Sequence, residues 1–204
     1  MDLQTFKKTF LHHIPTLQQA HACYAVLVPL VALPEGLCLL YEVRSADLHH
    51  HAREICFPGG KLEKGETNIQ CALRETEEEL GISARDIEII GELDFLYLRS
   101  DALMYPILAS VSPSALQDIR CNPAEVDHTL LIPVEELLAH PPKFYRYPLQ
   151  PMVDDRFPYE KVQAAPDYRW QNGRMEVPVY EDLPYPLWGL TARVTYWLLH
   201  MANQ

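Results

Sequence analysis

Residues 67–80 constrain the fold more than any other segment, because they have the pattern of one strong helix. Apolar side chains and one threonine recur there at helical spacing, in an inner stripe of Ile69, Ala72, Leu73, Thr76 and Leu80. Gly81 follows at a C-cap position, where glycine adopts the left-handed backbone that ends many helices. A helix with one such stripe requires a core on that side.

Apolar runs on both sides of this helix predict strands. They cover residues 22–33, 37–43, 87–98, 104–111 and 129–132, with turns at 34–36 and 99–101. Further helices are expected at residues 1–20, where Pro15 stops the apolar pattern, and at 133–139 and 188–201. Strands interrupted by one central helix and closed by another predict an α/β (α+β) fold, with a mixed β-sheet between helical layers.

Two segments lack a regular pattern. Residues 44–55 are polar and the Phe-Pro-Gly-Gly sequence at 57–60 breaks regular structure, so we expect loops there. Residues 141–186 hold most of the prolines and many aromatic residues, and we expect them to wrap over the core or form part of a pocket. The length of 204 residues fits a single domain spanning 1–204.

Composition excludes several classes of protein. A formal net charge of −11 makes duplex nucleic acid a poor partner, because an acidic surface repels a phosphate backbone. The sequence has no run of 18 apolar residues, which argues against a membrane span, and its first residues lack the apolar stretch of a signal peptide, which favours a cytoplasmic protein. Five cysteines without a Cys-x-x-Cys pair argue against a disulfide framework and a zinc site.

Three carboxylates on the helix indicate a divalent cation. Glu75, Glu78 and Glu79 are spaced i, i+3 and i+4, so they project from one face and repel one another. A hard cation with oxygen ligands turns that repulsion into binding, and Mg²⁺ or Mn²⁺ would also hold the oxygens of a diphosphate. The alternative is a solvated acidic helix face, which is the ordinary meaning of such a run taken alone.

Residues next to the carboxylates suggest how the site is supported. Arg74 and Glu66 are expected to form an ion pair that ties the preceding loop to the helix. Gly59 and Gly60 permit a close approach of the backbone, and the Gly60 carbonyl is a candidate metal ligand.

The segment 59–82 resembles the Nudix box. The matching positions are Gly60, Glu66, Arg74, Glu75, Glu78, Glu79, Gly81 and Ile82. Thr76 departs from the pattern, which has an aliphatic residue there, and we expect a small effect on packing only. The resemblance implies a Nudix-type α/β/α sandwich and metal-dependent hydrolysis of a diphosphate linkage in a small nucleotide-like substrate.

The same resemblance implies the roles of the residues. Glu75, Glu78 and Glu79 would bind the metal, and Arg74 and Glu66 would orient the loop and the helix. The catalytic base of the family often lies outside the box; Glu125 is our candidate for a base or an additional ligand, with a plain loop carboxylate as the alternative.

A narrower resemblance to coenzyme A pyrophosphatases covers most of the chain. It is carried by Leu40, Arg44, Ser45, Leu48, His51, Ala52, Phe57 and Pro58, and by the segments 25–31, 122–126 and 188–194. It implies a substrate-binding set of Arg44, Ser45, His51, Arg53 and Phe57, and hydrolysis of coenzyme A or its acyl derivatives. Four positions depart: the branch's Thr, Arg, Gly and a common Gln fall on Glu42, His49, Arg53 and Glu54.

Alternatives stay open at this point. The departures favour keeping ADP-ribose or another nucleoside diphosphate derivative as a substrate. A non-catalytic nucleotide-binding domain would be expected to lose a carboxylate, and all three remain. A prenyl diphosphate isomerase would need an activated cysteine, and Cys56 has no evident base, so we expect it to pack. The adjacent His49, His50 and His51 cannot all face one ion. Aromatic residues in 141–186 would stack a base or fill a homodimer interface.

Overall fold

The computed structural model describes residues 2–13, 17–18, 22–98, 101–165 and 167–204. Within these residues one mixed sheet has the strand order β3-β2-β1-β7-β5, with β4 beside β1, β6 beside β7 and β8 beside β2. Its strands are β1 (Ala22–Leu33), β2 (Gly36–Arg44), β3 (Ile55–Cys56), β4 (Gly59–Lys61), β5 (Ile87–Glu92), β6 (Leu96–Leu98), β7 (Ala102–Val111) and β8 (Val126–Pro133). The sheet is mixed because β1 and β7 pair in parallel and the other neighbours pair antiparallel.

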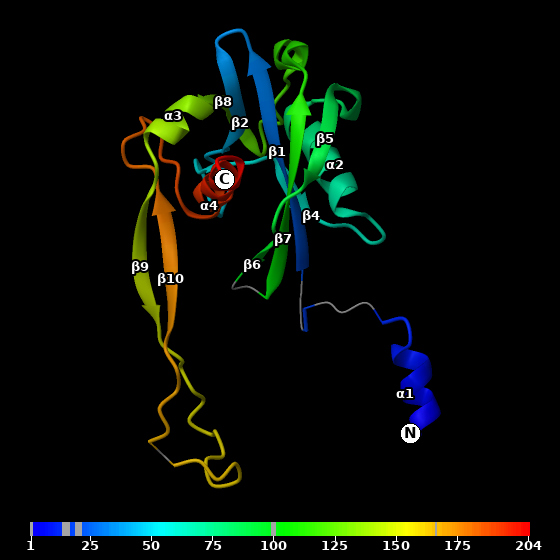
Figure 1. Ribbon diagram of the computed structural model, residues 1–204, viewed down its shortest axis with the longest axis vertical. Helices are drawn as coiled ribbons and strands as arrows, with labels where there is room; N and C mark the ends of the chain where they lie inside the picture. Colours follow the sequence, from blue (N-terminus) through cyan, green and yellow to red (C-terminus); the bar gives the residue numbers. More distant parts are fainter. Residues whose placement is uncertain (1, 14–16, 19–21, 99–100, 166) are drawn as a thin grey trace.

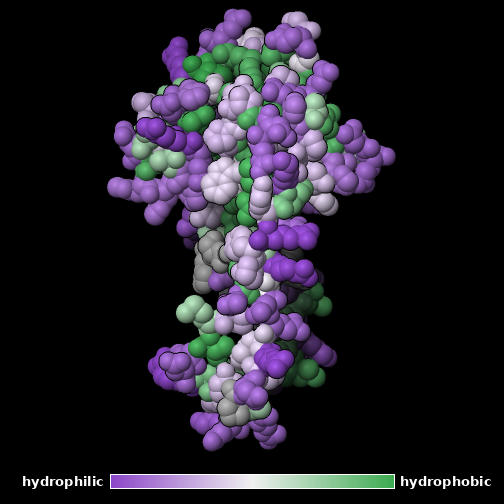
Figure 2. All heavy atoms as spheres, turned by 90° about the vertical axis from the view of Figure 1, so that its left-hand side faces the viewer, coloured by the Kyte–Doolittle hydropathy of each residue, from purple (hydrophilic) through white to green (hydrophobic). Residues whose placement is uncertain are grey.

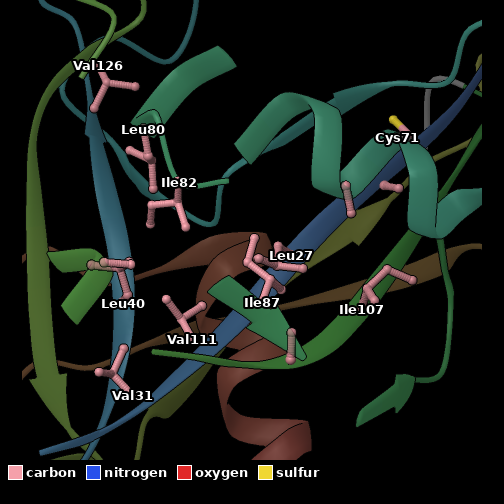
Figure 3. Packing of buried hydrophobic residues seen from close by; sticks show 14 residues of the cluster. Leu27, Val31, Leu40, Cys71, Leu80, Ile82, Ile87, Ile107, Val111 and Val126 are labelled. Carbon is pink, nitrogen blue, oxygen red and sulfur yellow. The ribbon is translucent and has the colours of Figure 1, made fainter. Parts of the chain in front are cut away.

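Helices cover both faces of this sheet (Figure 1). On one face, Cys71, Ala72 and Leu80 of α2 (Asn68–Leu80) pack with sheet residues such as Leu27 and Leu40 in one apolar cluster (Figure 3). On the other face, α4 (Gly189–Ala202) packs against a second cluster that includes Leu39 and Tyr41, beside the short α3 (Val134–Ala139). Neighbouring residues of β2 thus point to opposite faces, as a strand requires. The predicted α/β/α arrangement is confirmed.

Local signals define the ends of α2. Thr67 is the N-cap, and its hydroxyl accepts from the Gln70 N–H while the Gln70 side chain accepts from the Thr67 N–H, which makes a capping box. Gly81 is the C-cap at φ +72°, in the left-handed region that favours glycine. Thr76 is fully buried and donates its hydroxyl to the Ala72 carbonyl at 2.7 Å, so it faces the core as expected.

Short strands lie just before the Phe-Pro-Gly-Gly sequence and over its two glycines, where the sequence pattern predicted loops. β3 and β4 have two and three residues and pair with β2 and β1. Such short strands have no periodicity of their own and are defined by their partners. The short 3₁₀ turns at Ala84–Asp86 and Pro113–Asp118 precede and follow the hairpin of β5 and β7.

The sequence led us to expect that residues 141–186 wrap over the core or form part of a pocket. In the structure this segment does not wrap over the core along its whole length. Its two strands β9 (Lys143–Leu149) and β10 (Gly173–Val179) form an antiparallel ribbon that extends away from the sheet (Figure 1). Figure 2 views the molecule from the side of this ribbon and shows hydrophilic residues over most of that face. The two ends of the segment lie at the core, where Pro142 near its start and Tyr180 and Leu183 near its end are buried.

The N-terminal helix is shorter than predicted. α1 spans Leu3–Phe10, is capped by Asp2 and has no buried residue, so the expected helix over 1–20 is wrong in length. Residues 1, 14–16 and 19–20 of the expected helix, with Pro15, and residues 99–100 of the expected turn lie outside the described residues. In the part of the chain that the structure describes, no helix has the length and apolarity of a membrane span.

Candidate metal and substrate site

Two glycines bring β4 against both the sheet and α2. Gly59 pairs with Val26, and a Cβ atom on Gly59 would lie 2.3 Å from the Ala25 carbonyl oxygen. Its φ of +155° also disfavours other residues. A Cβ atom on Gly60 would lie 2.3 Å from Oε1 of Glu75. The close approach of this strand to the carboxylate helix therefore depends on the absence of both side chains.

Glu79 is the buried carboxylate of the three. It is 3% exposed, and its Oε2 accepts from the Gly59 N–H at 2.8 Å. Burial is the larger cause, and the negative charge of Glu42 the next, of a rise in the pKa of Glu79 from 4.5 to about 9. The hydrogen bond from the Gly59 N–H opposes this rise. The sequence analysis did not predict this burial, because the inner stripe it defined had no acid.

Glu42, on β2, is a further buried carboxylate that the sequence analysis did not assign to the site. It is 1% exposed, and Cys56 Sγ donates to its Oε1 at 3.1 Å. Its Oε2 is buried without a hydrogen-bond partner among the described residues. Burial raises the pKa of Glu42 to about 7, with smaller contributions from Glu125 and Glu75. The only signal in the sequence was an acid at an inward position of an apolar strand.

Arg74 holds the exposed side of the cluster together. Its Nε and Nη2 donate to the two oxygens of Glu66 at 2.9 and 3.2 Å, which is the expected ion pair between loop and helix. Its Nη1 also contacts Glu75 at 2.8 Å and Glu78 at 3.1 Å. The bond from Arg74 lowers the pKa of Glu66, whereas burial raises that of Glu75. Glu66 in turn accepts from the Glu63 N–H at 2.9 Å, so the loop is held at both ends.

Glu125 lies near the carboxylates although it is far from them in sequence. Its carbonyl accepts from the Ser45 N–H at 2.7 Å, which fixes the loop beside the end of β2. Its negative charge raises the pKa values of Glu42, Glu75 and Glu79. Glu125 is therefore close enough to act electrostatically on these carboxylates, and its role as a base or an additional ligand stays a prediction.

The donor set fits a hard divalent cation. Carboxylates that repel one another, a buried oxygen of Glu42 without a partner and a glycine cradle against Glu75 are features that a cation with oxygen ligands would satisfy. Among the described residues, no three or more His, Cys, Asp or Glu side chains are arranged so that they could hold a metal ion without moving. Arg74 accounts for part of this, because it engages Glu75 and Glu78.

The Gly60 carbonyl, a predicted ligand, also lies at this position. It accepts from Cys71 Sγ at 3.5 Å, a weak contact that leaves the oxygen capacity for another partner. The thiol of Cys71 is held neutral by burial, which raises its pKa to about 11.

The predicted substrate-binding loop forms the turn between β2 and β3. The Arg53 N–H donates to the Arg44 carbonyl at 3.1 Å, and the Arg44 N–H donates to the Glu54 carbonyl at 3.0 Å. His51 and Arg53 are exposed and have positive φ values of +58° and +62°, which L residues adopt at a cost. His51 pairs with the carboxylate of Glu54 at 3.0 Å.

Arg44 and Ser45 lie closer to the carboxylates than the tip of this loop does. The charge of Arg44 lowers the pKa of Glu42, and Arg44 Nε is buried without a hydrogen-bond partner among the described residues. Ser45 is 6% exposed. Within the predicted substrate-binding set, Arg44 and Ser45 are therefore half-buried or buried, whereas His51 and Arg53 are exposed to solvent.

Phe57 and Cys56 lie in packed surroundings. The ring of Phe57 is 5% exposed and stacks on Tyr41 with centroids 4.7 Å apart, and its part in substrate binding stays a prediction. Tyr41 is itself held by a hydrogen bond of 2.9 Å to Thr195 on α4. Burial and the charge of Glu42 raise the pKa of Cys56 well above its usual range, so it is a neutral thiol.

Two cavities lie near α4, and the second is lined mostly by residues of the segment 141–186, which was expected to wrap over the core or form part of a pocket. The first, of about 240 Å³, is mostly apolar and lined by Leu93, Asp94, Phe95, Leu96, Pro106, Arg193, Val194 and Trp197. The second, of about 440 Å³, is lined by Arg146, Arg174, Met175, Glu176 and Arg193. Neither contains a residue of the carboxylate cluster. They depend on how α4 and the ribbon meet the sheet, which no local pattern specifies.

Comparisons with known proteins indicate the family to which this chain belongs. The NUDIX domain profile matches residues 23–153. The chain is 33% identical to the mouse (Mus musculus) protein named mitochondrial coenzyme A diphosphatase NUDT8, over 95% of this chain and 84% of that protein. It is 38% identical to Nudix hydrolase 3 of Caenorhabditis elegans over 58% of this chain, and it spans only about half of that relative's length.

A solved structure supports the fold. The MutT/nudix family protein from Enterococcus faecalis superimposes with a TM-score of 0.50 at 13% identity, covering 100% of this chain and 71% of that protein. The profile match covers more than half of this chain, and the alignment with the mouse relative covers nearly the whole of this chain. This chain belongs to the NUDIX hydrolase family.

Proposed function

We propose that this chain hydrolyses the diphosphate bond of coenzyme A or an acyl-coenzyme A, giving 3′,5′-ADP and (acyl-)4′-phosphopantetheine, with Mg²⁺ or Mn²⁺ as cofactor. The observation that carries the reaction type is the carboxylate cluster built on Gly59, Gly60 and α2. The substrate class rests on the likeness to the mouse protein named as a coenzyme A diphosphatase.

Each residue has one task in this proposal. Glu75, Glu78 and Glu79 would hold the divalent ion, which when bound would neutralise charge on the diphosphate. Arg74 and Glu66 position the loop that presents Gly60. Glu125 is the candidate to accept the proton of the attacking water, since its carboxylate belongs to the same electrostatic cluster and lies outside the helix.

Recognition of the substrate is assigned to the loop after β2. Arg44 is half-buried at the end of β2, and Arg53 and His51 stand exposed at the turn, where His51 pairs with Glu54. These groups suit an anion such as a sugar phosphate. The cytoplasmic location and the homodimer stay predictions, and the mouse relative is named as mitochondrial.

Product analysis tests the function. Purified protein is incubated with Mg²⁺ or Mn²⁺ and with coenzyme A, acetyl-coenzyme A, ADP-ribose, NADH or diadenosine polyphosphates, and products are separated by chromatography. We expect 3′,5′-ADP and phosphopantetheine from coenzyme A at the highest kcat/KM. Turnover of ADP-ribose with coenzyme A untouched would replace the substrate assignment, and inactivity with every substrate would favour a nucleotide-binding domain.

A pair of variants on one helix tests the carboxylate assignment. Glu78→Gln removes a proposed ligand and should lower kcat by about 10²-fold or more, because charge stabilisation dominates this chemistry. Glu77→Gln is the matched control, since Glu77 is an exposed neighbour outside the cluster. Near-normal turnover in Glu78→Gln would contradict the assignment.

A further inference from the structure

Glu42 is an acid in the interior of the sheet. It lies in β2, between Cys56 of β3 and Thr129 of β8, and is 1% exposed. Leu40, two residues earlier, packs in the cluster beneath α2, and the alternation along a strand places Glu42 on the same side. The side chain therefore points toward the helix that carries Glu75 and Glu79.

The surroundings of Glu42 do not satisfy a carboxylate. One oxygen accepts only a thiol hydrogen bond, and Oε2 has no hydrogen-bond partner among the described residues. The charge of Arg44 favours the ionised form of Glu42, whereas the three other carboxylates in this region, those of Glu75, Glu79 and Glu125, oppose it. A buried polar atom without a partner is strongly unfavourable, and a buried carboxylate among like charges more so.

We propose that Glu42 supplies its free Oε2 as a further oxygen ligand of the divalent-cation site formed by the carboxylates of α2 and Glu125. This inference rests on the metal-dependent function proposed above and concerns a residue outside the segment that resembles the Nudix box. In the resemblance to coenzyme A pyrophosphatases, the position of Glu42 corresponds to threonine. A cation would give the orphan oxygen a partner and remove the repulsion between Glu42 and Glu79 at once.

The competing account has Glu42 acting only as a repulsive neighbour that keeps a proton on Glu79. The two accounts predict opposite effects on cation binding. If Glu42 is a ligand, its loss weakens binding. If Glu42 only repels, its loss makes Glu79 easier to ionise, and binding becomes tighter or stays the same.

Calorimetric titration with Mn²⁺ in the absence of substrate separates the two accounts. We expect Glu42→Gln and Glu42→Thr to bind Mn²⁺ about 10- to 100-fold more weakly than the unaltered protein. Glu77→Gln removes the same charge outside the cluster and should bind normally. Unchanged or tighter binding in both Glu42 variants would overturn the inference while leaving the proposed function intact.

Thermal unfolding excludes a trivial loss of structure. In EDTA, Glu42→Gln should have a Tm equal to or above that of the unaltered protein, because a neutral amide replaces a buried acid whose ionised form is unfavourable. On addition of Mn²⁺, its Tm should rise less than that of Glu77→Gln. An equal rise in both variants would contradict the inference. If the unaltered protein bound no Mn²⁺, the inference and the proposed metal chemistry would both fail.

Discussion

Gly60 offers the sharpest test of the site, because its neighbour is a carboxylate rather than the core. In Gly60→Ala the new Cβ atom would meet Oε1 of Glu75 at 2.3 Å, whereas ordinary contacts begin at 3.4 Å. The carboxylate would therefore have to move by about 1 Å. A displacement of that size in a reacting geometry costs about 10²-fold in turnover.

The cost to folding should be smaller than the cost to catalysis. The clash is with the end of a side chain, so we expect about 1 kcal/mol, near the lower end of the range for overpacking. Gly91→Ala is the matched control: a Cβ atom there has nothing within 4 Å. It should change the free energy of unfolding by less than about 1 kcal/mol and leave turnover unaltered.

Three measurements on both variants decide the matter: kcat on the substrate found in the product analysis, Mn²⁺ affinity by calorimetry, and urea unfolding in EDTA. Gly60→Ala should lose turnover and Mn²⁺ affinity while it remains folded. If it retained both within twofold, Glu75 would not be held by this cradle, and the argument from Gly60 would be refuted. A loss of the same size in Gly91→Ala would show that the effect does not come from the carboxylate.

Three further predictions follow from the same contacts. In metal-free protein, Glu79 and Glu42 keep protons that the unfolded chain loses above about pH 4.5. The free energy of unfolding should therefore fall as pH rises toward 9, by at most about 1.4 kcal/mol per pH unit for each retained proton. Urea unfolding in EDTA at several pH values measures this free energy, and a rise with pH would contradict the burial of these acids. Thr76→Val removes only a hydroxyl bond to the Ala72 carbonyl, so stability should change by no more than about 1 kcal/mol with kcat unaltered, as urea titration and kinetics will check. Arg53→Gly relieves a left-handed residue, and kcat/KM for coenzyme A should increase if this loop binds the substrate, whereas an unchanged value would assign the loop another role.

The features that the sequence predicted correctly are those that neighbouring residues determine. The length of α2, its capping by Gly81 and the ion pair of Arg74 with Glu66 all involve residues within one short segment. The strand at 22–33 was also predicted to the residue, because its long apolar run ends at a turn signal. Local rules are sufficient for such elements.

The features that the sequence did not predict depend on partners that are distant in the chain. β9 and β10 are separated by more than twenty residues and become strands only by pairing, so their own prolines and aromatic residues indicated a loop. The burial of Phe57 likewise requires Tyr41 and, through it, Thr195 on α4. Amphipathic spacing at 1–20 predicted too long a helix, because α1 buries none of its residues and gains nothing from packing.

The position of Glu42 shows how a functional residue escapes sequence reasoning. In the chain it interrupts an apolar strand, and an acid in such a place is usually taken as a residue at an edge. Here β3 and β8 flank it on both sides, so the acid is sealed within the sheet and directed at α2. The fold is held by two apolar clusters that do not include the carboxylates, so it tolerates their repulsion. A site assembled in this way gains stability when a cation binds, by an amount that the cation concentration relative to its Kd determines.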